Sequence, residues 1–122
     1  MKITSFNPLI LTTDPENTIK LFEELGFERR HTKDGLDERD DITGVRMKDP
    51  NGFCVDVVES SRAKQDMVTI RMNVDNFDEA RTMLESHGFT SPNEVVTDAS
   101  SKSIGMFSPS GFMISLVEHI KK

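Results

Sequence analysis

An internal repeat constrains this sequence more than any other feature. The stretch DPENTIKLFEELGF at 14–27 and the stretch NFDEARTMLESHGF at 76–89 share a helix cap, a helical apolar spacing and a terminal Gly-Phe, at an offset of 62 residues. Further along, DPNGFCVDVV at 49–58 and SPSGFMISLV at 108–117 repeat a turn and an alternating strand at an offset of 59. The same elements in the same order predict two copies of one structural unit.

Each copy contains one predicted helix. In the first copy Asp14 is a suitable N-cap, Gly26 ends the helix, and the apolar stripe between them is formed by Ile19, Phe22 and Leu25. In the second copy the cap is Asp75 or Asn76 and the stop is Gly88, with the stripe Phe77, Ala80, Met83 and Leu84.

Four strands accompany each helix. Apolar alternation and the proline-containing turns DPNG and SPSG predict strands at 7–13, 27–33, 42–48 and 53–59, and again at 67–74, 94–99, 102–107 and 112–118. The fold class is therefore α+β, built as a single domain from two β-α-β-β-β modules at about 1–60 and 66–122. One helix covers one face of each sheet, so we expect the sheets to curve around a central trough. The charged stretch 33–41 is predicted to be a surface loop.

Composition excludes several classes of function. The 122 residues suit one domain, and 35% hydrophobic with 30% charged residues is typical of a globular protein. A net charge of −6 argues against nucleic acid or an anionic membrane as partner. The single cysteine, Cys54, and the lack of a long apolar run predict a cytoplasmic protein without disulfides.

The run Asp14–Phe27 and the run Asp49–Asp56 resemble the vicinal oxygen chelate superfamily, which includes glyoxalase I, extradiol dioxygenases, and fosfomycin- and bleomycin-resistance proteins. The resemblance extends through both modules. It implies the glyoxalase/bleomycin-resistance fold and a homodimer. The resemblance further implies, for the enzymes of the superfamily, a divalent metal held by one residue from the first strand and one from the last strand of each module, usually His and Glu.

Transferring these ligand positions gives an unusual set. The first-strand ligand lies seven residues before the capping residue, and the last-strand ligand lies four residues after the turn glycine. The matching positions are Asn7, Asp56, Thr69 and Ser115. With no histidine and one carboxylate, this set predicts that the protein has no metal and no other cofactor. Of the three histidines, His87 and His119 are predicted to be solvated or structural, and His31 is the one that faces the trough if any does.

Strand alternation indicates what lines the trough. Asn7 shares its face with Leu9 and Leu11, Asp56 with Cys54 and Val58, Thr69 with Arg71 and Asn73, and Ser115 with Met113 and Val117. The opposite, apolar face is expected to lie under the helices, and it contains Pro8, Ile10, Phe53, Val55, Val57, Ile70, Met72, Phe112, Ile114 and Leu116. The predicted ligand-binding residues are Asn7, Leu9, Asp56, Thr69, Arg71, Met113 and Ser115. Asp56 and Arg71 are expected either to pair with each other or to bind charged groups of a ligand.

Aromatic residues are few for a pocket that would stack a flat antibiotic. The sequence has no Trp or Tyr, and only Phe6, Phe107, Phe27 and Phe89 are candidates for such a role. The leading hypothesis is a small-molecule-binding protein without metal-dependent catalysis. The alternatives are a lyase- or dioxygenase-type enzyme with a weak or unusual metal site, a drug-binding resistance protein, and a dimeric protein whose trough is filled by its own side chains.

Overall fold

The chain divides into two compact units in the computed structural model, which describes residues 1–30, 42–60, 64–97 and 99–119. The N-terminal unit consists of residues 7–68, and the C-terminal unit consists of residues 1–6 together with 69–122. The loop predicted at 33–41 and His31 lie outside the described residues. Within the described part of the chain, no helix has the length and apolar character needed to cross a membrane.

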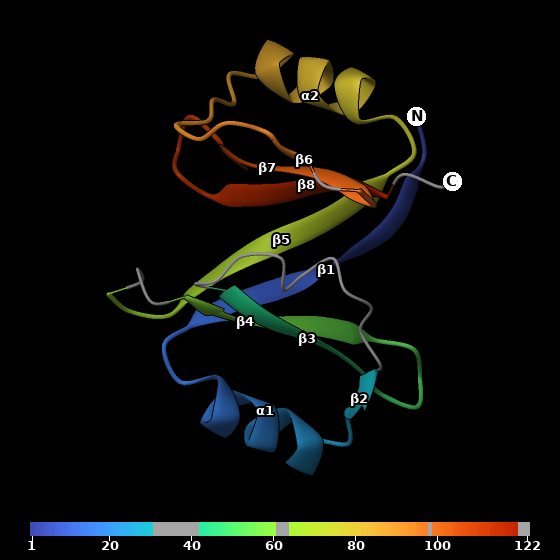
Figure 1. Ribbon diagram of the computed structural model, residues 1–122, viewed down its shortest axis with the longest axis vertical. Coiled ribbons are helices and arrows are strands. Elements are labelled where there is room, and N and C mark those ends of the chain that lie inside the picture. Colours follow the sequence, from blue (N-terminus) through green and yellow to red (C-terminus); the bar gives the residue numbers. More distant parts are fainter. Residues whose placement is uncertain (31–41, 61–63, 98, 120–122) are drawn as a thin grey trace. The chain divides into compact units, whose positions relative to one another are not determined.

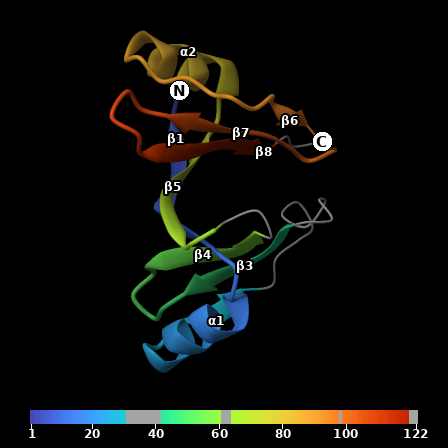
Figure 2. The same ribbon diagram turned by 90° about the vertical axis from the view of Figure 1, so that its left-hand side faces the viewer.

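The N-terminal unit has four strands and one helix (Figure 1). The chain runs through β1 (Ile3–Thr12), α1 (Pro15–Glu24), β2 (Glu28–Arg30), β3 (Ile42–Lys48) and β4 (Cys54–Ser60). The strand order is β2-β3-β4-β1, in which β1 is parallel to β4 and the other neighbours are antiparallel. The helix lies against one face of these strands, and among the described residues of this unit no helix lies against the other face (Figure 2).

The C-terminal unit repeats this plan. Its elements are β5 (Met67–Val74), α2 (Phe77–Ser86), β6 (Val96–Thr97), β7 (Ser101–Phe107) and β8 (Met113–His119), in the strand order β5-β8-β7-β6. β5 is parallel to β8, and the remaining neighbours are antiparallel. The first residues of β1 belong to this unit, where the backbone N–H of Asp75 donates to the carbonyl of Lys2 at 3.0 Å. The α+β class and the β-α-β-β-β order predicted for each half are confirmed.

Both helices begin and end where local chemistry predicts. The side chain of Asp14 accepts from the backbone N–H of Asn17, and the side chain of Asn76 accepts from that of Glu79, so Asn76 rather than Asp75 is the second cap. Gly26 and Gly88 follow the helices with φ of 106° and 89°, a backbone conformation that favours glycine.

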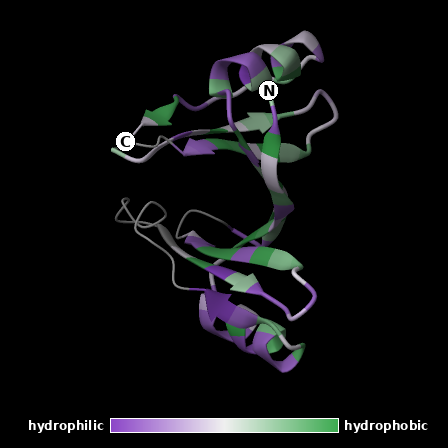
Figure 3. Ribbon diagram, turned by 90° about the vertical axis from the view of Figure 1, so that its right-hand side faces the viewer, coloured by the Kyte–Doolittle hydropathy of each residue, from purple (hydrophilic) through white to green (hydrophobic). Residues whose placement is uncertain are grey.

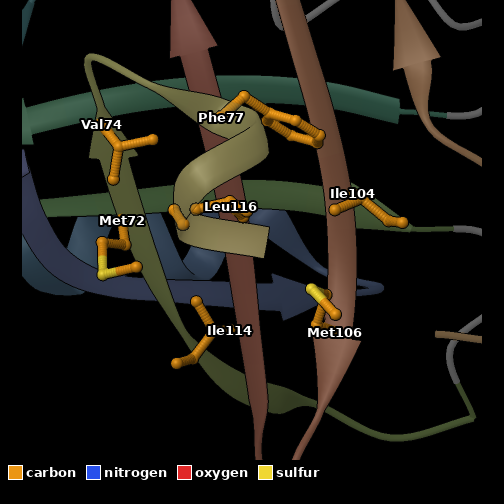
Figure 4. Packing of buried hydrophobic residues seen from close by; sticks show 8 residues of the cluster. Met72, Val74, Phe77, Ile104, Met106, Ile114 and Leu116 are labelled. Atoms are coloured by element: carbon orange, nitrogen blue, oxygen red, sulfur yellow. The ribbon is translucent and has the colours of Figure 1, made fainter. Parts of the chain in front are cut away.

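A separate hydrophobic core lies under each helix. In the N-terminal unit Ile19 of α1 packs on Met47, Val55 and Val57. In the C-terminal unit Phe77 and Ala80 of α2 pack on strand residues that converge beneath the helix (Figure 4), namely Met72, Val74, Ile104, Met106, Ile114 and Leu116. In Figure 3 the hydrophobic colour follows the strands of both units, whereas hydrophilic residues predominate on the helices. The alternation predicted for the central strands is therefore confirmed.

Several predicted burials and strand boundaries are wrong. Phe53 and Phe112 were expected under the helices, but they are 67% and 53% exposed because each follows a turn at the very start of its strand. Leu25 and Met83, expected in the helical stripes, are also exposed. β6 has two residues instead of the six expected at 94–99, and β1 begins at Ile3, four residues earlier than expected.

Candidate functional site

The helix-free face of the N-terminal unit places Asn7, Leu9 and Asp56 on two neighbouring strands. Parallel pairing of β1 with β4 sets Leu9 beside Asp56, and Asn7 lies two residues before Leu9 on the same face. All three side chains are buried, and Asp56 has no exposed surface. Asn7 and Asp56, two of the four positions matched to metal ligands, are hydrogen-bonded to each other in this unit.

Arg46 completes this group from the strand on the other side of Asp56. β3 pairs with β4 so that Arg46 lies directly opposite Asp56. The Arg46 guanidinium donates from Nε to Asp56 Oδ1 at 3.0 Å and from Nη2 to Asp56 Oδ2 at 3.2 Å. Nη2 also donates to Asn7 Oδ1 at 3.0 Å, while Asn7 Nδ2 donates to Asp56 Oδ2 at 2.8 Å. We call these three residues the Arg46 triad, in which every member is hydrogen-bonded to both others.

The electrostatics of the triad follow from this geometry. The hydrogen bond to Asp56 is the largest influence on Arg46, and it raises the pKa of the guanidinium, against the lowering effect of burial. Arg46 is thus a permanent positive charge with 26% of its side chain exposed, facing a carboxylate that is fully buried. A fork-to-carboxylate pair of this kind fixes both partners in one orientation.

The C-terminal unit carries the other predicted site residues on its own helix-free face. Parallel pairing of β5 with β8 sets Arg71 beside Ser115. Thr69 Oγ1 and Ser115 Oγ lie 3.4 Å apart, and either hydroxyl can be the donor. Arg71 is 5% exposed and donates from Nε to Asn73 Oδ1 at 3.1 Å. Thr69, Arg71 and Ser115 are therefore brought together within this unit.

Met113 lies next to a position at which the C-terminal unit differs from its counterpart. Gly105 lies opposite Ser115 in the β7–β8 pair, just as Arg46 lies opposite Asp56 in the β3–β4 pair. The terminal methyl of Met113 lies 2.9 Å from the position that a Cβ on Gly105 would take. The methionine thus covers the strand at the position where the other unit has its arginine.

Comparison with solved structures decides the fold. Methylmalonyl-CoA epimerase from Mycobacterium tuberculosis superposes with a TM-score of 0.72 at 16% identity, covering 98% of this chain and 90% of the epimerase. A glyoxalase/bleomycin resistance protein/dioxygenase superfamily member from Vibrio splendidus superposes with a TM-score of 0.63 at 14% identity, covering 96% and 99% of the two chains. The chain has the vicinal oxygen chelate fold.

A metal-containing protein is among the structures that share this vicinal oxygen chelate fold. The Mn(II)-bound glyoxalase from Novosphingobium aromaticivorans superposes with a TM-score of 0.59 at 17% identity, covering 96% of this chain and 39% of the glyoxalase. No family model matches the sequence, and no curated protein matches it either. At these identities the likeness shows the fold, and the reaction has to be argued from the site.

The residues present do not fit the divalent metal that the vicinal oxygen chelate fold implies. Asp56 is the one carboxylate at the four matching positions, and both of its oxygens already accept hydrogen bonds from Arg46 and Asn7. The oxygen of Asn7 accepts from the same guanidinium, and Thr69 and Ser115 offer only neutral hydroxyls. Among the described residues no three His, Cys, Asp or Glu side chains gather to hold a metal ion.

Arg46 is the member of this triad that sequence reasoning missed. Its signal was present, because counting outward from the DPNG turn pairs Lys48 with Cys54 and then Arg46 with Asp56. The prediction assigned side chains to faces only in the first and last strands of each module, so the residues of the strand at 42–48 were not assigned to a face. Arg46 donates to both carboxylate oxygens of Asp56.

The remaining candidates fall away from the site. His87 and His119 are exposed, as predicted. Phe27 and Phe89 pack against Phe22 and Phe112 in edge-to-face pairs with ring centroids 5.4 and 5.6 Å apart. Both rings also contact the hydrophobic cores. Two of the four rings considered for stacking an antibiotic therefore have structural partners.

Proposed function

We propose that this protein binds a small organic molecule on the helix-free faces of its strands and does so without a divalent metal. The observation that carries the proposal is the Arg46 triad. In a metal-containing relative the cation would neutralise the acidic ligand of the last strand, whereas here a guanidinium from the same unit supplies that positive charge. Asp56 is thus neutralised by the chain's own residues.

The composition of the helix-free faces supports the ligand-binding part. In the N-terminal unit the buried Asn7 shares its face with Leu9, and in the C-terminal unit the buried Thr69 and Arg71 share theirs with Met113. A few convergent polar groups among apolar side chains are typical of small-molecule sites. Sequence reasoning proposed the same residues, and they remain the proposed ligand-binding set together with Asp56 and Ser115.

Direct acid–base catalysis by Asp56 is not favoured by this geometry. A general base needs an oxygen within reach of the proton that it removes. Both Asp56 oxygens are acceptors of N–H groups that belong to the protein. The proposal is therefore a binding protein, and the homodimer and cytoplasmic location implied by sequence remain part of it.

Two measurements test this proposal. Elemental analysis of purified protein, followed by titration with Mn²⁺, Ni²⁺ and Zn²⁺, is expected to show no tight stoichiometric binding, and such binding would refute the metal-free part. A thermal-shift screen against metabolites and antibiotics is expected to find stabilising compounds whose effect is lost in Arg71→Met but kept in Arg81→Met. A complete lack of stabilising compounds would refute the binding part. Light scattering of the same sample reports the oligomeric state.

A further inference from the structure

The turn that joins β3 to β4 contains the one Asn-Gly pair of the sequence, Asn51–Gly52. The turn spans residues 49–52 and is closed by the Gly52 N–H, which donates to the Asp49 carbonyl at 3.0 Å. The Asn51 N–H donates to Asp49 Oδ1 at 3.0 Å. Both residues of the pair are exposed, so the turn presents them to water.

An asparagine followed by glycine can modify itself. The backbone nitrogen of the second residue attacks the side-chain carbonyl carbon of the asparagine, so a C–N bond forms and a cyclic succinimide closes. The bond from that carbon to the side-chain nitrogen breaks, and the nitrogen leaves with the amide proton as ammonia. Water then opens the ring at either carbonyl and leaves aspartate or isoaspartate. The reaction consumes one water, releases one ammonia and needs no other reactant.

The surroundings of Gly52 leave room for this attack. Glycine has no side chain to shield its nitrogen, and a Cβ at Gly52 would meet nothing within 4 Å. The Asn51 side chain makes no hydrogen bond to any residue that the structure describes, so it is free to turn toward the Gly52 nitrogen. The hydrogen bond from Gly52 to Asp49 opposes the attack, but surface turns open locally at little cost in free energy. The turn therefore slows the reaction without preventing it.

The other asparagines lack these conditions. Asn7 is followed by proline, whose nitrogen has no hydrogen to lose, and Asn73 is 5% exposed. The side chain of Asn17 bonds to the residue that caps α1, and the side chain of Asn76 caps α2. Asn93 is followed by glutamate, whose side chain shields the next nitrogen.

We propose that Asn51 is a site of spontaneous deamidation in the folded protein, where aspartate and isoaspartate form in the turn before β4. The proposal does not depend on ligand binding. Isoaspartate adds a methylene group to the backbone, so the turn bond of Gly52 and the 3.0 Å bond from the Asp49 N–H to the Phe53 carbonyl cannot both keep their geometry. Either product also places a second carboxylate beside Asp49, and the two repel each other.

The test is a timed incubation of the full-length protein at mildly alkaline pH, followed by tryptic digestion and mass spectrometry against a sample taken at the start. The peptide 49–62 is expected to gain about 1 Da, because an NH₂ group is replaced by OH. A protein isoaspartate methyltransferase with a labelled methyl donor is expected to label the same peptide.

The C-terminal unit supplies a matched control. Its turn at 108–111 is closed in the same way, with the Gly111 N–H donating to the Ser108 carbonyl at 3.0 Å, but it has Ser110 where the first turn has Asn51. The tryptic peptide 103–121, which contains this turn and no asparagine, should gain no mass. Asn51→Ser copies that turn into the first unit and should lose both the mass gain and the methyl label.

A second comparison measures the influence of the fold. A synthetic peptide with the sequence 49–62 should deamidate faster than the folded protein, since no turn holds its glycine N–H. The aged protein, separated by ion exchange, should unfold at a lower urea concentration than Asn51→Asp, because the variant has the new charge without the added methylene.

Three results would contradict the proposal. The first is a mass gain in peptide 49–62 of the folded protein no larger than that of the asparagine-containing peptides 3–20 and 72–81. The second is a mass gain at 49–62 that persists in Asn51→Ser. The third is a lack of methyl label in the aged protein. Each of them leaves the proposed ligand binding untouched.

Discussion

The two units have one architecture but differ in charged residues at matching positions. The cross-strand pair Arg46–Asp56 in the N-terminal unit corresponds to Gly105–Ser115 in the C-terminal unit, and the first-strand pair Asn7 and Leu9 corresponds to Thr69 and Arg71. Arg46 and Asp56 form an ion pair in the N-terminal unit, whereas Gly105 and Ser115 at the matching positions carry no charge. A duplicated framework thus allows matching positions to differ in charge while the strand order is kept.

The largest expected effect on stability comes from removing the arginine of the Arg46 triad. Arg46→Met removes two hydrogen bonds from the fully buried Asp56, and breaking a buried ion pair in this way costs about 3–5 kcal/mol. Urea denaturation at pH 7 measures the change. The control is Arg29→Met, which removes an exposed arginine paired with Glu23 and should cost at most about 1 kcal/mol. Equal effects of the two substitutions would show that the triad contributes no more than a surface pair.

The sign of the pH dependence follows from the same pair. The pKa of Arg46 is raised by Asp56, so the folded state holds this proton more tightly than the unfolded state. Its contribution to stability is fully present below the ordinary arginine pKa and is lost only as pH rises through the higher folded value. The difference in stability between the natural chain and Arg46→Lys should therefore not change from neutral to moderately alkaline pH in urea titrations. A difference that disappears in that range would contradict the assignment.

Replacing the Arg46–Asp56 pair with its counterpart from the C-terminal unit is expected to recover part of the stability that Arg46→Gly alone loses. Arg46→Gly with Asp56→Ser copies the Gly105–Ser115 arrangement into the N-terminal unit and removes both charges together. The double variant should be more stable than Arg46→Gly alone by about 1–3 kcal/mol, since no uncompensated carboxylate remains buried. A complete double-mutant cycle, with Asp56→Ser as the third variant, measures the coupling. Additive effects of the two single changes would show that the pair is not coupled.

Alanine substitutions at the glycines that follow the two helices are expected to have an intermediate effect on stability. Gly26 and Gly88 both have positive φ, so alanine at either position should cost about 1–2 kcal/mol. A Cβ at Gly26 meets nothing within 4 Å, whereas one at Gly88 would lie 2.8 Å from Pro109 Cγ. Gly88→Ala should therefore destabilise the protein more than Gly26→Ala in thermal unfolding. The reverse order would indicate that the Pro109 ring moves aside easily.

The smallest expected effect concerns the helix caps. Asp14→Ala and Asn76→Ala each remove one side-chain acceptor at a helix N-terminus and should cost about 1 kcal/mol each. Asp14→Asn and Asn76→Asp retain an acceptor and serve as controls that should be nearly neutral. Circular dichroism during urea titration follows both series. A negligible loss for Asn76→Ala would show that Glu118, which accepts from the Phe77 N–H at 2.7 Å, secures this helix start by itself.

Sequence reasoning succeeded where the determinants are local. The caps Asp14 and Asn76 and the turn glycines Gly52 and Gly111 act within four residues, so their patterns predict helices and hairpins directly. Strand alternation predicted the faces of Asn7 and Asp56, but their contact follows from the parallel register of β1 with β4. Phe53 and Phe112 were wrongly predicted to be covered by the helices. Strand alternation gives the face on which a residue lies, but it does not show how far along the strand the helix covers that face. Arg46 required the register of a middle strand, and Asp56 could be matched with a partner only after that register was known.

The division of β1 between the units has a consequence for biosynthesis. Residues 1–6 complete a unit whose other residues are synthesised after the N-terminal unit, since the amide of Lys2 donates to the Asp75 side chain across 73 positions of sequence. During translation from the N-terminus these residues have to wait for β5 before they find their strand partner. Contacts between residues so far apart in sequence slow folding, because the entropic cost of closing the intervening loop has to be met before the contact forms. A chain cut in the linker between the repeats would therefore yield a C-terminal fragment that lacks its first strand segment, even though the duplicated sequence suggests two self-sufficient halves.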